Sequence, residues 1–319
     1  MSNVLVIHGG CGVLQPGALS KERETICTRV LTTALSNGYA ILRKGGSSVD
    51  AVCEAVRVME DCDQFNAGKG AVFARDGTIE CDAGLMHGKT GAAGGVACAK
   101  RIKNPILAAR FVMENSPHAL ICGSAADDLA LNNQLDVVED QRYFETELRR
   151  GQLQKLLLRK DSGPICDHSG PQGTVGAVAL DSQGLLAAAS STGGLNGKMP
   201  GRVSDSSVVG AGFWADDRVA VTATGNGDNF LRACACRHTS DIVRLTNVPL
   251  DVACDQVVNG LLARNTAYKQ EGKMKEPSAG LIAVDIDGNY CMPFNTSGMF
   301  RGVVSDNNQE PWVAVFKDN

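Results

Sequence analysis

The 319-residue sequence lacks the features that mark several large classes of protein. Its longest apolar runs fall well short of the roughly 18 residues that a membrane-spanning helix needs, so we expect no membrane partner. Lys and Arg are scattered among acidic residues, the net charge is −4, and no basic stripe exists, which argues against a nucleic-acid partner. The start, MSNVLVIHGG, has no basic region before its short apolar run. We therefore expect no secretory signal and a cytoplasmic protein.

The sequence also lacks a cysteine pattern typical of a metal site or a disulfide framework. Its twelve cysteines include no CxxC pair, and the only close pair is Cys234 and Cys236. We expect reduced thiols that behave as small buried side chains. Glycine, in contrast, is abundant: 36 copies are about 11% of the chain, against the usual ~7%. They cluster at residues 8–12, 66–70 and 191–194, which indicates tight turns there.

Helical and strand patterns alternate in both halves of the chain. Ser47 stands three residues before Asp50, which is typical of a helix start, and Asn104-Pro105 predicts another. Residues 142–172 form a charged, helix-like piece followed by a Gly/Pro-rich linker. Strands are predicted at 4–7, in a hairpin over 72–79, and at 94–98, 174–180, 185–189, 281–284 and 290–294; helices are predicted at 21–44, 47–59, 105–114, 145–160, 228–238 and 250–267. This order indicates an α/β fold with stacked sheets covered by helices.

The junction between Gly173 and Thr174 carries the strongest chemical hypothesis. The linker ends there, and an apolar strand begins with a hydroxyl residue. A cut before Thr174 would create an N-terminal threonine whose hydroxyl attacks an acyl carbon while its own α-amine accepts the proton. Gly173 lacks a Cβ and so tolerates the strained backbone that such a cut demands. On this spacing alone Thr174 can equally be an ordinary strand residue.

Several motifs in a fixed order resemble one family, the plant-type asparaginases and isoaspartyl peptidases, which are N-terminal-nucleophile hydrolases of the threonine type. The resemblance covers nearly the whole chain apart from the linker. The motifs are Ile7-His8-Gly9-Gly10, Phe65-Asn66-Ala67-Gly68, Asn104-Pro105, Gly173-Thr174-Val175-Gly176-Ala177-Val178-Ala179-Leu180-Asp181, Ser191-Thr192-Gly193-Gly194, Pro200-Gly201-Arg202-Val203-Ser204-Asp205 and Thr224-Gly225-Asn226-Gly227-Asp228.

The resemblance implies a four-layer αββα sandwich that forms one hydrolase domain over residues 1–319. Autocleavage between Gly173 and Thr174 would give an α-chain of residues 1–173, with its linker at about 142–172, and a β-chain of residues 174–319. The family also implies a homodimer of such αβ units. The expected substrates are small: L-asparagine and β-aspartyl dipeptides, each releasing L-aspartate.

The resemblance also assigns catalytic roles. Thr174 would be the nucleophile, and the hydroxyls of Thr192 and Thr224 would orient it. The Thr224 hydroxyl and the Gly225 backbone N–H would stabilise the oxyanion that forms during amide hydrolysis. Asn66 matches a family residue that lies near the site during processing.

A second group of residues would bind the substrate. Arg202 would hold its α-carboxylate and Asp205 its α-ammonium group, assisted by the Gly227 carbonyl and beside Thr224 and Gly225. Without the neighbouring motifs, Arg202 and Asp205 could also form an ordinary surface ion pair.

No cofactor is expected for catalysis, but the family has a structural sodium ion. Its ligands are main-chain carbonyls of a loop that corresponds to residues 59–69 here, and carbonyl oxygens suit a hard cation. The candidates are Met59, Glu60, Cys62, Phe65, Ala67 and Lys69.

Some residues depart from the family pattern or have a plain interpretation. Cys11, Ser204 and Asp228 stand where the family commonly has a smaller residue, glycine and glutamate, which leaves the preference between asparagine and dipeptides open. His8 is expected to be a hydrogen-bonded core residue. Two alternatives also remain: a glycosylasparaginase-like amidase, which the missing signal sequence disfavours, and an uncleaved, non-catalytic binding protein with the same fold.

Overall fold

The computed structural model describes residues 2–12, 19–158, 173–262 and 278–317. Its strands are β1 (Val4–Gly12), β2 (Cys81–His87), β3 (Ala93–Ala99), β4 (Ile121–Cys122), β5 (Val175–Leu180), β6 (Leu186–Thr192), β7 (Phe213–Ala215), β8 (Val219–Gly225), β9 (Ala279–Asp285), β10 (Tyr290–Cys291), β11 (Gly298–Ser305) and β12 (Asn308–Phe316). In these ranges they form an eight-stranded sheet, β12-β11-β1-β5-β6-β2-β3-β4, and a four-stranded sheet, β10-β9-β8-β7.

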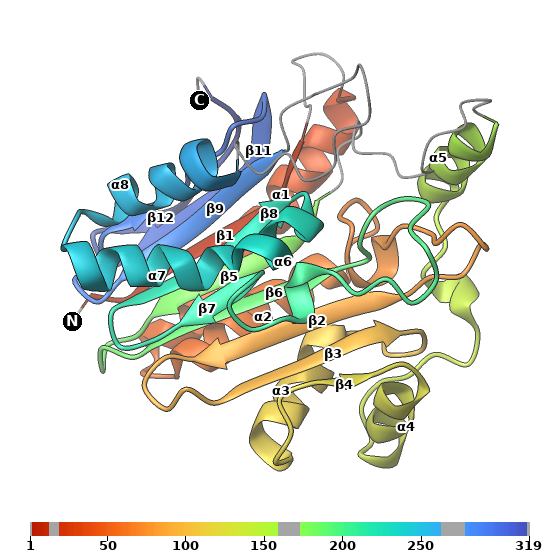
Figure 1. Cartoon of the computed structure of the whole chain (residues 1–319), viewed down its shortest axis with the longest axis horizontal. Coiled ribbons are helices and arrows are strands. Elements are labelled where there is room, and N and C mark those ends of the chain that lie inside the picture. The colour runs from red at the N-terminus through yellow and green to blue at the C-terminus, as the bar shows by residue number, and fades with distance from the viewer. Residues whose placement is uncertain (1, 13–18, 159–172, 263–277, 318–319) are drawn as a thin grey trace.

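Along the chain all the described helices lie between β1 and β9 and alternate with groups of strands, so the predicted α/β class is confirmed. They are α1 (Lys21–Arg43), α2 (Ser48–Glu60), α3 (Pro105–Asn115), α4 (Ser124–Asn132), α5 (Glu147–Leu157), α6 (Gly227–Ala233), α7 (Ala235–Thr246) and α8 (Leu250–Asp255), with a π-helical turn at Gln256–Leu262. Figure 1 shows α7 and α8 together over the smaller sheet, far from α3 and α4.

Helix starts follow the sequence in part. Ser47 caps α2, because its hydroxyl accepts the backbone N–H of Asp50 and donates to the Asp50 carboxylate at 2.7 Å. Asn104 precedes α3 as predicted, but its side chain donates to Asp61 at 2.9 Å and does not cap the helix. The interaction with Asp61 ties the start of α3 to the end of α2.

Successive side chains of a strand point to opposite faces of the sheet and pack into different hydrophobic cores. In β1, Leu5 and Ile7 pack with α1, α2 and α3 against one face of the larger sheet, while Val4 and Val6 pack with residues of the smaller sheet. A further cluster, which includes Phe230, lies between the smaller sheet and helices α6 to α8. Both faces of β1 are therefore buried.

Several predicted elements differ in extent. The hairpin at 72–79 is a single bridge between Phe73 and Ile79. The helix at 228–238 is broken at Cys234, which has a left-handed backbone with φ of 46°. The predicted strand at 290–294 is reduced to Tyr290–Cys291. Residues 159–172 of the predicted linker and the end of the last predicted helix lie outside the described residues.

The order of strands brings distant motifs to one place. Strand β5 lies between β1 and β6 in the larger sheet, and β8 packs against β5 and β6 from the smaller one. The three threonines of the sequence motifs lie immediately before β5, at the end of β6 and near the end of β8. Among the described helices, none combines the length and apolar character of a membrane span.

Candidate active site

Thr174 lies immediately before β5 and is 9% exposed. Its Oγ1 donates to Thr192 Oγ1, at the end of β6, across 3.2 Å. Thr192 Oγ1 also accepts the Gly194 backbone N–H at 3.0 Å. The two hydroxyls therefore form a buried pair whose orientation is fixed by a backbone donor.

The peptide group before Thr174 is held from two sides. The Gly173 carbonyl accepts the backbone N–H of Asn66 at 3.1 Å. A Cβ on Gly173 would lie 2.1 Å from the Gly9 carbonyl oxygen, and one on Gly10 would lie 1.9 Å from the Gly173 Cα. Close approach of two backbone segments thus requires glycine at these positions.

Asn66 links this carbonyl to the segment after β6. Its Nδ2 donates to the Gly194 carbonyl at 2.7 Å, its Oδ1 accepts the Val72 N–H at 2.9 Å, and its own carbonyl accepts the Gly193 N–H at 3.0 Å. The side chain is buried, and each of its polar atoms has a partner. The backbone N–H of Asn66 points at the Gly173 carbonyl oxygen, and an N–H in this arrangement stabilises an oxyanion that develops there.

Thr224 reaches the same place from the smaller sheet. The Cys11 backbone N–H donates to Thr224 Oγ1 at 3.2 Å, and the Cys11 thiol donates to the Thr224 carbonyl at 3.3 Å. Since Gly10 packs on Gly173, the consecutive residues Gly10 and Cys11 lie between Gly173 and Thr224. Gly225 follows with a φ of +136°, a conformation that favours glycine.

Arg202 and Asp205 converge on Gly227. A Cβ on Gly227 would lie 2.2 Å from Asp205 Oδ1 and 3.0 Å from Arg202 Nη2. The ion pair of Arg202 is with Asp228, at 2.9 Å, while its Nε is buried without a partner among the described residues. Asp205 is 4% exposed, and burial raises the pKa of its carboxyl to about 7, although Arg202 opposes that shift.

This geometry corrects one interpretation of the sequence. Arg202 and Asp205 do not form an ordinary surface ion pair, because Asp205 is buried and the salt bridge of Arg202 is with Asp228. The sequence motifs mark Asp228 as a departure from the family pattern and do not predict its ion pair with Arg202. A guanidinium beside a buried carboxyl can bind a zwitterion by both of its charges.

The segment that the resemblance assigns to sodium, residues 59–69, begins in the last turn of α2 and continues into the loop after it. A Cβ on Gly68 would lie 2.5 Å from the Glu60 carbonyl oxygen, and one on Gly70 would lie 2.1 Å from that of Phe65. The carbonyl oxygens of Glu60 and Phe65, two of the candidates, thus lie beside glycines of this loop, and oxygen donors of this kind fit a hard cation. In the described ranges, no group of three or more His, Cys, Asp or Glu side chains could hold a metal ion.

Sequence reasoning missed the charged residues that hold the segment carrying Arg202. Lys198 is fully buried and donates to the Glu80 carbonyl at 2.8 Å, and Glu80 Oε2 accepts the Gly201 N–H at 2.9 Å. Asp82 Oδ2 accepts the Ser204 N–H at 2.7 Å. A possible signal was the acid-apolar-acid pattern of Glu80-Cys81-Asp82.

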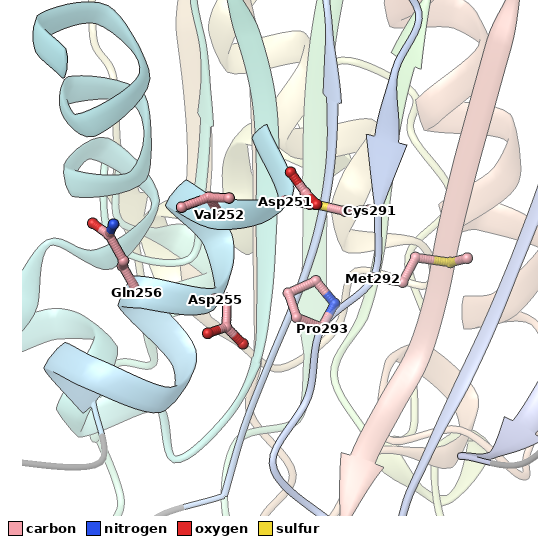
Figure 2. Close-up of a pocket in the computed structure, with 7 residues that line it drawn as sticks. All are labelled: Asp251, Val252, Asp255, Gln256, Cys291, Met292 and Pro293. Carbon is pink, nitrogen blue, oxygen red and sulfur yellow. The ribbon is translucent and has the colours of Figure 1, made fainter. Parts of the chain in front are cut away.

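A separate open pocket of about 450 Å³ contains none of these residues (Figure 2). It lies between the α8 region and the segment that begins with β10. Its lining residues are Asp251, Val252, Asp255, Gln256, Cys291, Met292 and Pro293. It therefore belongs to a different part of the molecule from the threonines.

Known proteins are similar to this chain along nearly its whole length. A family model described as "Asparaginase" matches residues 1–314. An isoaspartyl peptidase of Escherichia coli (strain K12) is 43% identical over 306 residues, which cover 93% of this chain and 91% of that protein. An isoaspartyl peptidase/L-asparaginase of Bos taurus is 38% identical, covering 99% of this chain and 94% of its own. A plant-type L-asparaginase of Pyrobaculum calidifontis is 38% identical, covering 93% and 95%. These matches confirm the resemblance that the motifs indicate.

Proposed function

Because the chain belongs to the asparaginase family, we propose that it is an amidohydrolase that releases L-aspartate from L-asparagine and from β-aspartyl dipeptides. The names of the relatives, isoaspartyl peptidase and L-asparaginase, support these two substrate classes. The observation that carries the proposal is the contact between the Thr174 and Thr192 hydroxyls, 3.2 Å apart, beside a Gly173 carbonyl held by the Asn66 N–H.

The first step is activation by cleavage between Gly173 and Thr174. Thr174 Oγ1 attacks the Gly173 carbonyl carbon, and the Asn66 N–H stabilises the charge that develops on the carbonyl oxygen. The bond from the Gly173 carbonyl carbon to the Thr174 nitrogen breaks, the nitrogen takes up the hydroxyl proton, and the acyl group stays on Oγ1 as an ester that water then hydrolyses. The products are a Gly173 carboxylate and a Thr174 with a free α-amine.

The second step is hydrolysis of the substrate amide. The free α-amine of Thr174, with an ordinary pKa of about 7.7 to 8.0, accepts the hydroxyl proton as Oγ1 attacks the side-chain carbonyl of the substrate. The Thr224 hydroxyl and the Gly225 N–H stabilise the oxyanion. Ammonia or the amine of the dipeptide leaves, and water releases aspartate from the acyl-enzyme. The Cys11 N–H donates to a lone pair of Thr224 Oγ1, so this contact does not use the hydroxyl proton that the oxyanion needs.

Arg202 and Asp205 select the aspartyl part of the substrate. The Arg202 guanidinium binds the α-carboxylate, and Asp205, with the Gly227 carbonyl, binds the α-ammonium group. The closeness of both Arg202 Nη2 and Asp205 Oδ1 to Gly227 supports this assignment. Both groups sit on backbone held by buried charges, which limits their movement.

The proposal also includes the layered fold, the division of the chain, the dimer and the sodium site. The helix-covered sheets form a four-layer αββα sandwich of the N-terminal-nucleophile type, which is supported by one core between the two sheets and one between each sheet and its helices. The single domain is divided at residue 174 into an α-chain, with the linker at 142–172 near its end, and a β-chain. Two such αβ units form a homodimer. The segment at 59–69 holds a structural sodium ion through main-chain carbonyls, which the oxygen donors of Glu60 and Phe65 beside Gly68 and Gly70 support.

A matched pair of proteins tests the activity. Thr174→Ala should neither be cleaved nor release aspartate, whereas the wild type should do both. Release of aspartate from asparagine and from a β-aspartyl dipeptide supports the proposal; activity confined to sugar-linked asparagine would indicate a glycosylasparaginase-like amidase. A full-length chain that binds these compounds without hydrolysing them would indicate a binding protein.

A further inference from the structure

His8 contacts the backbone of Thr174 directly. It lies on β1 and is fully buried, and its Nδ1 is 3.0 Å from the Thr174 carbonyl oxygen. A carbonyl oxygen can only accept, so Nδ1 carries the proton in this contact. Burial lowers the pKa of the His8 imidazole to about 3, so the ring is neutral and Nε2 holds a lone pair. Nε2 has no partner among the described residues.

The contact between His8 and Thr174 lies just beyond the point where the pairing of β5 with its neighbouring strands ends. Pairing between β1 and β5 ends at His8 and Gly176, and pairing between β5 and β6 begins at Val175 and Ser191. Thr174 therefore lies beyond both sets of strand pairs. The His8 side chain extends the connection between the two strands as far as Thr174.

The two peptide groups on either side of the Thr174 side chain are thus both held. The Gly173 carbonyl accepts the Asn66 N–H at 3.1 Å, and the Thr174 carbonyl accepts the His8 Nδ1–H at 3.0 Å. Fixing both peptide planes fixes the direction of the bond from Cα to Cβ, and so the direction of Oγ1 toward Thr192. Once the peptide bond after Gly173 is cut, the hold through Gly173 is lost, while the hold through His8 remains.

The ring itself cannot turn freely. A Cβ on Gly176 would lie 2.4 Å from His8 Nε2 and 2.8 Å from Thr222 Oγ1, so the imidazole fills the space that the missing side chain leaves. The glycine at 176 and the histidine at 8 therefore act as a pair. Packing keeps Nδ1 directed at Thr174.

We propose that His8 is a positioning residue for Thr174, required both for cleavage of the chain and for hydrolysis of the substrate. This inference rests on the proposed function and extends it to a residue whose sequence suggested only a core role. His8 does not itself exchange a proton with the substrate. It acts by holding the nucleophile in a direction from which attack is possible.

Two amide substitutions separate this role from simple packing. The Asn side chain places its amide N–H near the position of Nδ1, whereas Gln places it near the position of Nε2. We expect His8→Asn to be cleaved and to keep kcat within about threefold of the wild type. We expect His8→Gln to lose about a hundredfold in kcat, with KM changed less than twofold, the scale of loss for a misplacement near 1 Å. Thermal unfolding of both variants controls for packing.

The outcomes are distinct. Equal activity of the two variants, or equal loss in both at equal Tm, would overturn the role of His8 while the proposed function stands. A wild type that is neither cleaved nor active would overturn both. If neither variant folds, ¹⁵N NMR of wild-type His8 decides: a neutral ring protonated on Nδ1 supports the inference, and protonation on Nε2 overturns it, because Nδ1 could then not donate to Thr174.

Discussion

Replacing Thr192 by valine tests the hydroxyl pair with little change in shape. The variant removes the oxygen that accepts from Thr174 Oγ1 at 3.2 Å and from the Gly194 N–H at 3.0 Å. Thr192 is 1% exposed, so the Gly194 N–H would be left buried without this acceptor, at a cost of about 1–3 kcal/mol in the free energy of unfolding. A similar loss of about 1–3 kcal/mol at the transition state corresponds to a decrease in kcat of roughly 5- to 150-fold.

The assay must separate cleavage from turnover. Aspartate release is measured and divided by the fraction of chain that carries a free Thr174, which a denaturing gel provides. Thr192→Ser keeps the oxygen and serves as the control, and we expect it to retain kcat within a few-fold. A cleaved Thr192→Val protein with a wild-type kcat would refute the reasoning.

Three further substitutions test the remaining parts of the site. Gly173→Ala should slow cleavage by about a hundredfold, because its Cβ would lie 2.1 Å from the Gly9 carbonyl oxygen. Gly151→Ala places its Cβ in open space on α5, so it should leave cleavage unchanged. The ratio of gel bands over time measures cleavage of both variants. Asp205 has a pKa raised to about 7, so its charge is present above pH 7 and lost below it. KM for asparagine should therefore rise as the pH falls through 7, and Asp205→Asn should have a higher KM that no longer changes there; an unaltered pH profile would count against the role of the carboxylate. Arg202→Lys should raise KM by about tenfold or more with a smaller effect on kcat in steady-state kinetics, since a lysine cannot bind a carboxylate by two parallel hydrogen bonds; an unchanged KM would contradict that assignment.

Short sequence patterns predict those helices and hairpins whose turn or capping residues are adjacent to them in the chain. The turn at 181–184 between two apolar runs predicts the β5–β6 hairpin, and Ser47 with Asp50 predicts the start of α2. The sequence patterns do not predict strands β2, β4, β7, β8, β11 and β12. Strand β2 contains the buried Asp82, and β12 contains Pro311, which interrupts a strand pattern but is tolerated at the edge of a sheet, where β12 lies.

The motifs predict candidate site residues, but not how these residues contact one another. The Cys11–Thr224 contact joins residues 213 positions apart, and the His8–Thr174 contact joins residues 166 apart. Neither has a local periodicity that a sequence could reveal. The buried state of Asp205 also depends on packing between two sheets, so its raised pKa follows only from the fold.

Intact-mass analysis of purified protein, taken over time and paired with aspartate release, tests the central claim most directly. A total mass of 33.5 kDa divided in the ratio 173 to 146 gives fragments of about 18 and 15 kDa, the smaller one beginning at Thr174. We expect activity to increase in step with these fragments. A preparation that releases aspartate at full rate while every chain keeps its full mass would contradict the account.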